Sequence, residues 1–129
     1  MRALWTSLLV IAAAVLPMAV HGQTFPKDTT APSADELKLR ITGKSFHARL
    51  SGGGTWHVDY KPGGGMRMKT RNSLDGPEQL DEEGGWEVQD GRICRIDLKG
   101  ATVCNEVRVS GNHLYLQRES GDVVEIDPD

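Results

Sequence analysis

The stretch TWHVDYKPGGGMRMKTR, residues 55–71, contains the pattern that decides the fold. Apolar and polar residues alternate on both sides of the turn-forming segment Pro62-Gly-Gly-Gly65, and a period of two is typical of a strand with one buried face. The stretch therefore predicts a β-hairpin. The side chains expected to face inward are Trp56, Val58, Tyr60, Met66, Met68 and Thr70.

The same alternation continues along the chain. Further strands are predicted near 45–51, from Trp86, and at about 92–98, 101–109, 113–118 and 122–127, with Gly-containing turns between the later ones. About eight short strands joined by tight turns predict a mainly β, single-domain antiparallel meander, either a small barrel or a strongly coiled sheet. One short helix precedes them, at about Ala34 to Thr42. Its predicted start is the capping-box pattern Ser33-Ala-Asp-Glu36, and Gly43 ends it.

The N-terminal residues have the features of an export signal. Arg2 precedes a short apolar run, and Val20 and Gly22 occupy the positions expected before a cleavage site, so residues 1–22 are predicted to be a signal peptide. Pro17 and His21 interrupt the run, which argues against a membrane anchor. Residues 23–32 are polar and aperiodic and predict a disordered leader, followed by one β-rich domain, 33–129. The predicted location is periplasmic or secreted.

The two cysteines, Cys94 and Cys104, flank the turn Leu98-Lys99-Gly100. A three-residue loop with Gly100 in the left-handed conformation pairs Asp97 with Ala101 and places the cysteines directly opposite each other. Opposed residues of an antiparallel pair lie near the distance that a disulfide requires. An even cysteine count in an exported chain therefore predicts one disulfide.

Charge and motifs exclude several functions. Residues 23–129 keep 14 Lys and Arg residues against 18 Asp and Glu residues, a formal net charge of −4, which argues against nucleic acid or an anionic membrane as partner. No nucleophile motif accompanies His57 and Asp59, so we predict no catalytic residues and no enzyme. The acidic segment 72–85 is predicted to be a long loop. It lacks the ligand order of an EF-hand, so we predict neither a metal nor a cofactor.

Two sets of residues are candidates for binding. Arg67, Lys69 and Arg71 face outward as a positive row and are candidates for docking an exported protein with an acidic surface, unless the neighbouring acidic segment pairs with them. Trp56, Tyr60 and Trp86 occupy inward positions. They either fill the core or line a cavity for an apolar ligand.

In the order of its features, the chain resembles small exported bacterial β-rich proteins of unknown function. These features are the helix from Ser33 to Leu37, Gly43-Lys44, Gly85-Trp86-Glu-Val, Ile93-Cys94-Arg95 and Cys104. A looser similarity is to exported β-barrel inhibitors of proteases or lysozymes. We expect a non-enzymatic binding or protein-interaction module. The alternatives are a lipocalin-like binder of a small apolar ligand and a periplasmic inhibitor of a hydrolase.

Overall fold

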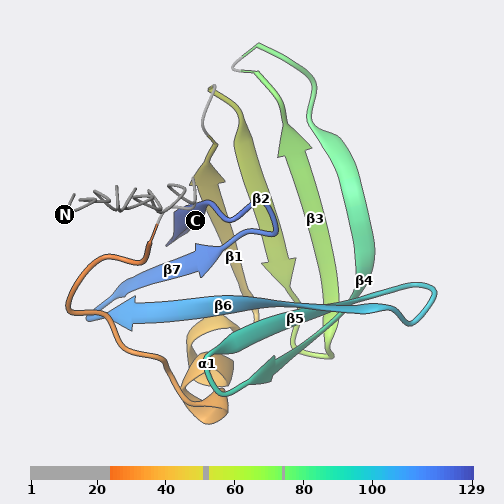
Figure 1. Ribbon diagram of the computed structural model, residues 1–129. Coiled ribbons are helices and arrows are strands. Elements are labelled where there is room, and N and C mark those ends of the chain that lie inside the picture. The colour runs from red at the N-terminus through yellow and green to blue at the C-terminus, as the bar shows by residue number, and fades with distance from the viewer. Residues whose placement is uncertain (1–23, 51–52, 74) are drawn as a thin grey trace, which may run out of the picture.

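The computed structural model describes residues 24–50, 53–73 and 75–129, so the predicted signal peptide lies outside the described residues. Eight antiparallel strands form a closed barrel in which each strand pairs with the next one in the chain (Figure 1). This confirms the mainly β prediction, and of its two architectures the structure adopts the barrel. The elements are α1 (Ala34–Ile41), β1 (Lys44–Arg49), β2 (Thr55–Tyr60), β3 (Gly65–Arg71), β4 (Gln79–Gln89), β5 (Arg92–Asp97), β6 (Thr102–Ser110), β7 (His113–Gln117) and β8 (Val123–Pro128).

The helix α1 closes one end of the barrel. Its first turn is capped as predicted, because the Ser33 hydroxyl accepts a hydrogen bond from the Glu36 amide at 3.2 Å. Leu37 and Ile41, four residues apart on one face, are fully buried in the core. Figure 1 shows α1 below one end of the barrel, while β3 ends and β4 begins at the opposite end.

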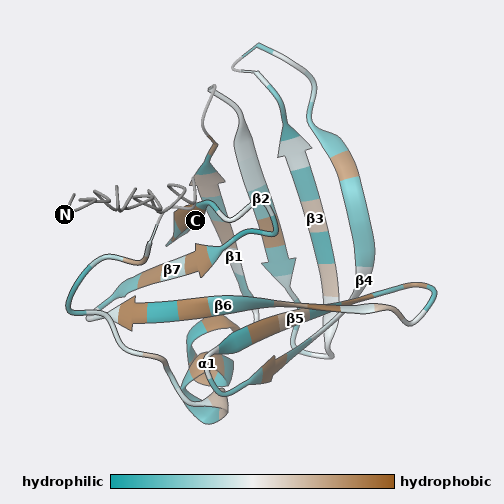
Figure 2. Ribbon diagram, in the orientation of Figure 1, coloured by the Kyte–Doolittle hydropathy of each residue, from teal (hydrophilic) through white to brown (hydrophobic). Residues whose placement is uncertain are grey.

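Alternation along the strands builds the core. Val58 of β2 pairs with Met68 of β3, and both belong to the inward set predicted from the sequence. Figure 2 shows the same alternation of hydrophobic and hydrophilic residues along β6, where Val107 and Val109 are buried. The barrel is therefore held mainly by apolar side chains that project from one face of each strand.

The barrel closes between its first and last strands. Phe46 and His47 of β1 pair with Pro128 and Asp127 of β8. Beyond this pair of positions, the Asp129 amide donates to the Ser45 carbonyl at 3.0 Å. This seam is short, whereas neighbouring strands elsewhere pair over four to six positions.

The acidic segment corrects one prediction. We expected a loop over 72–85, but Gln79–Gly85 forms the first part of the eleven-residue strand β4. Because this segment contains charged residues and two glycines, it lacks the alternation of apolar and polar residues that predicts a strand. Gly84 is needed there because a Cβ atom at this position would lie 2.1 Å from the Ile96 carbonyl oxygen. A register shift between Met68 and Lys69 further disturbs the period of two.

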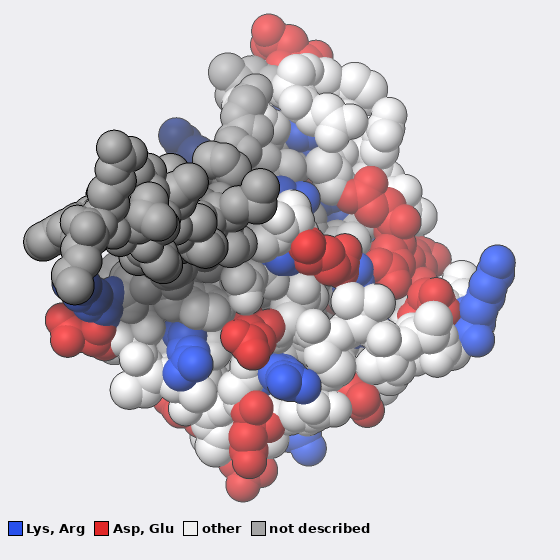
Figure 3. Space-filling model, viewed as in Figure 1, with Lys and Arg blue, Asp and Glu red and all other residues white. Residues whose placement is uncertain are grey.

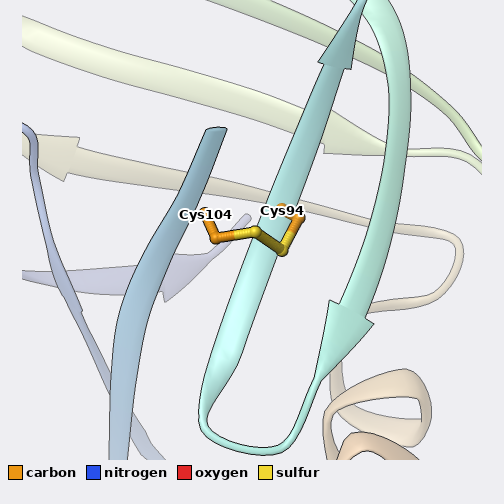
Figure 4. The surroundings of a disulfide bond; sticks show 2 residues. All are labelled: Cys94 and Cys104. Atoms are coloured by element: carbon orange, nitrogen blue, oxygen red, sulfur yellow. A yellow bond between two sulfur atoms is a disulfide. The ribbon is translucent and has the colours of Figure 1, made fainter. Parts of the chain in front are cut away.

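The disulfide is confirmed. Cys94 of β5 and Cys104 of β6 are directly paired and bonded to each other (Figure 4). The turn beyond them also follows the prediction: the Asp97 amide donates to the Ala101 carbonyl at 2.9 Å, and Gly100 has a φ of +87°.

The segment before the helix, predicted as a disordered leader, contacts the barrel. Thr30 pairs with Val109 of β6, and the Gly91 amide donates to the Pro32 carbonyl at 2.7 Å. In the residues that the structure describes, no helix is both long enough and apolar enough to cross a membrane.

Candidate functional site

A cavity of about 290 Å³ occupies the barrel interior. Its apolar part is lined by inward residues of four strands: Trp56, Val58, Tyr60, Met66, Met68, Ile93 and Leu116. Its polar part is lined by Thr70, Asp81, Arg95, Asn105, Arg118, Glu119 and Ser120. The combination of an apolar wall with a few polar groups is typical of a small-molecule site.

The two ends of the cavity can be told apart by the residues that line them. Tyr60 marks the end next to the helix, because the amide of Gly43, just after α1, donates to the Tyr60 carbonyl at 2.8 Å. Thr70 near the end of β3, and residues 118–120 of the β7–β8 turn, mark the opposite end. Polar residues therefore line the cavity at the end that the helix does not close, next to the apolar ring of Trp56, which pairs with Thr70. We call this end the mouth.

Two of the three candidate aromatic residues line the cavity. Trp56 and Tyr60 are buried and form part of its wall. Trp86 instead packs edge-to-face against Tyr60, with 5.6 Å between the ring centroids, and its indole N–H donates to the Lys61 carbonyl at 2.9 Å. Trp86 thus fixes the position of the Tyr60 ring rather than contacting the cavity itself.

The Tyr60 hydroxyl is kept neutral by its surroundings. Burial raises the pKa of this phenol well above its ordinary value, and the positive charge of Arg95 opposes the shift only in part. At neutral pH, Tyr60 therefore brings to the cavity wall a hydroxyl that can donate or accept a hydrogen bond.

An ion-paired arginine, Arg95, lines the cavity. The Arg95 Nε atom lies 3.2 Å from Glu82 Oε2, and its Nη2 atom pairs with the Glu119 carboxylate of the β7–β8 turn. The side chains of Arg95 and Glu82 are each 21% exposed, whereas that of Glu119 is 57% exposed. The pair with Glu119 therefore ties the β7–β8 turn to the barrel wall at a partly hydrated position.

Neutral polar groups complete the mouth. The Asn105 side-chain amide, buried on β6, donates to the Gln117 carbonyl at 3.0 Å. The Thr70 hydroxyl donates to the Asp81 carboxylate. Sequence reasoning missed Arg95 and Asn105, although each lies an even number of positions from an inward apolar residue, Ile93 and Val107 respectively. A polar residue at an inward position is the signal that identifies them.

The positive row on β3 is largely paired within the protein. Arg67 Nη2 lies 2.9 Å from Glu83 Oε1, and Lys69 Nζ lies 3.2 Å from Glu78 Oε1. Arg71 Nε is buried, and no hydrogen-bond partner for it exists among the described residues. Figure 3 shows acidic and basic side chains interspersed over the viewed face of the molecule. Docking of an acidic partner on this row stays a prediction, and such a partner would compete with the acidic side chains already present.

A second polar cluster lies at the β1–β2 pair. The Ser45 hydroxyl donates to Asp59 Oδ1 at 2.5 Å, and His57 Nε2 lies 2.9 Å from the same oxygen. Asp129 joins the two histidines: its carboxylate oxygens lie 2.6 Å from His47 Nδ1 and 3.4 Å from His57 Nδ1. The Ser45 hydrogen bond lowers the pKa of Asp59, as do the hydrogen bond and charge of His57, while burial opposes these effects.

The arrangement differs from a Ser–His pair. The Ser45 hydroxyl donates to the Asp59 carboxylate and not to a histidine ring, and the lowered pKa of Asp59 makes this carboxylate a weak base for the Ser45 proton. Within residues 24–50, 53–73 and 75–129, no three His, Cys, Asp or Glu side chains are arranged to hold a metal ion. The cluster stabilises the seam between β1 and β8, where Asp129 follows the last strand.

In comparisons with known proteins, no protein-family model, no curated protein and no solved structure matches the chain.

Proposed function

We propose that the protein is a non-enzymatic binding module that holds a small molecule inside its barrel. The observation that carries the proposal is the cavity of about 290 Å³, whose lining combines apolar walls with polar groups at the mouth. Pockets for small molecules have volumes of roughly 300–1,000 Å³, so the cavity suits a compact ligand rather than a long lipid. The disulfide and the predicted signal peptide support a role in an oxidising, exported compartment.

The protein-interaction and hydrolase-inhibitor hypotheses stay predictions. The residues nominated for docking, Arg67 and Lys69, already pair with Glu83 and Glu78, so a partner on this row would gain little without displacing them. The cavity is built from the barrel itself and has no such competitor in its apolar part. It is therefore the better-supported site.

The test is to fill the cavity. Met68→Trp adds a large ring to the cavity wall, and Leu98→Trp adds the same ring at an exposed turn position, 84% accessible, as the matched control. We expect an environment-sensitive apolar dye to bind the native protein and the Leu98 variant with equal affinity. Binding to the Met68 variant should fall at least about tenfold, because the substituted side chain occupies the ligand volume. Calorimetric titration measures all three affinities.

Two results would contradict the proposal. One is equal dye binding to all three proteins, which would place the dye on the outer surface. The other is the absence of any binding to the native barrel. Thermal unfolding of the Met68 variant checks that its barrel is intact, since overpacking of a core has its own cost in stability.

A further inference from the structure

We infer that the ligand of this cavity is a small amphipathic carboxylate and that Arg118 binds its carboxylate group. The inference rests on the proposed function and specifies its ligand. The mixed lining suits an apolar body, placed against residues such as Val58, Met68 and Leu116, and a polar end that reaches the polar groups at the mouth. The sign of the charge at the mouth then determines whether the polar end of the ligand is an anion or a cation.

The charges at the mouth differ in how far they are hydrated. Of the charged residues that line the cavity, Asp81 and Glu119 are exposed, whereas Arg95 and Arg118 are half-buried. Water already solvates the two acids, so they gain little from a ligand. The two half-buried charged groups that line the cavity are therefore both cations.

The two arginines differ in how far they are neutralised. Arg95 pairs with Glu82 and Glu119. In the described part of the chain, Arg118 forms no ion pair, although Asp122 and Glu125 border the same neighbouring surface depression. A half-buried guanidinium without a carboxylate partner gains more than an exposed one from a charge-assisted, bidentate hydrogen bond. Arg118 is thus the group at the mouth with unused binding capacity.

The charge count favours a monoanion. One unpaired guanidinium balances one negative charge, and a dianionic phosphate ester would bring excess negative charge beside Asp81 and Glu119. A carboxylate also matches the planar fork of a guanidinium. The cavity volume limits the apolar part of the ligand to a short chain or a single ring.

The test uses three probes that share one apolar chain and differ in the head group: octanoate, octanol and octylamine. We expect octanoate to bind the full native protein at neutral pH at least about tenfold more tightly than either of the others, since its carboxylate alone pairs with Arg118. If octanol or octylamine binds as tightly as octanoate, the inference is wrong while the proposed function stands. If none of the three binds, both fail.

Two variants then locate the carboxylate. Arg118→Gln should lower octanoate affinity at least about tenfold and leave octanol affinity unchanged, which a merely structural effect would not do. Arg92→Gln, at an exposed position outside the cavity lining, is the matched control and should change neither affinity. Unchanged octanoate binding in the Arg118 variant, or an equal loss in both variants, would overturn the assignment. The head-group comparison on the native protein remains decisive even if Arg118→Gln fails to fold.

Discussion

At the scale of single residues, the hydrogen bonds around Asp59 make part of the stability dependent on pH. The pKa of Asp59 is lower in the folded protein than its ordinary value of 3.8, chiefly because Ser45 donates to the carboxylate. A lowered folded-state pKa means that the unfolded chain binds the proton more tightly. The stabilisation by Asp59 is therefore fully present above pH 3.8 and is lost as the pH falls through the lower folded-state pKa.

We predict that Asp59→Asn lowers the free energy of unfolding by about 1 kcal/mol at pH 7. The difference from the native protein should shrink as the pH falls below 3.8, because the native carboxylate is then protonated as well. Urea unfolding at several pH values measures both curves. A difference that is constant from pH 7 to strongly acid conditions would show that the carboxylate charge does not contribute.

A second prediction for single residues concerns Trp86, whose ring packs on Tyr60 while the next residue, Glu87, is exposed. Trp86→Ala should lower the free energy of unfolding by about 3–5 kcal/mol, since it leaves a void behind the cavity wall. Glu87→Ala, the adjacent control, should change it by less than about 0.5 kcal/mol. Equivalent urea midpoints for the two variants would mean that the Trp86 ring does not support the core.

At the scale of elements, the β5–β6 hairpin is held by the Cys94–Cys104 bond. We predict that Cys104→Ser lowers the free energy of unfolding by about 2–3 kcal/mol, the entropic value for closing a short loop. Cys104 is the better position for this change, because it is half-buried whereas Cys94 is fully buried. Denaturation of the native protein with and without a reducing agent should give the same difference. No effect of reduction would indicate that the bond does not stabilise the barrel.

The elements also show what a sequence can and cannot predict. Period-two alternation and glycine turns were enough for the β2–β3 hairpin and for the register that opposes the cysteines. They failed for the first half of β4, where acidic side chains pair with β3 instead of alternating with apolar ones. Prediction of the cavity residues would have required knowledge of which strands lie next to each other in the barrel. Arg95 of β5 and Arg118 of the β7–β8 turn line the same cavity, and no pattern within either segment shows that the two share it.

At the scale of the whole molecule, the barrel combines a closed end and a polar mouth in a small domain. The helix α1 places Leu37 and Ile41 against one end, and the β7–β8 turn reaches the other through the pair of Glu119 and Arg95. A ligand that enters at the mouth therefore meets polar groups there and apolar walls along the barrel. The polar cavity residues come from the ends of β3 and β4, from the β7–β8 turn, and, for Arg95 and Asn105, from within β5 and β6.

The short seam between β1 and β8 has a consequence for how the chain folds. Each other strand pair joins neighbours in sequence, whereas the seam joins Phe46 to Pro128 and His47 to Asp127. Local hairpins close short loops, but the seam requires the ends of the domain to meet, so we expect it to form last. Its amide protons should then exchange with deuterium through local opening at a lower free energy than those of the β2–β3 pair. Mass spectrometry of peptic fragments measures this exchange strand by strand. Uniform protection around the barrel would instead indicate that all eight strands open together.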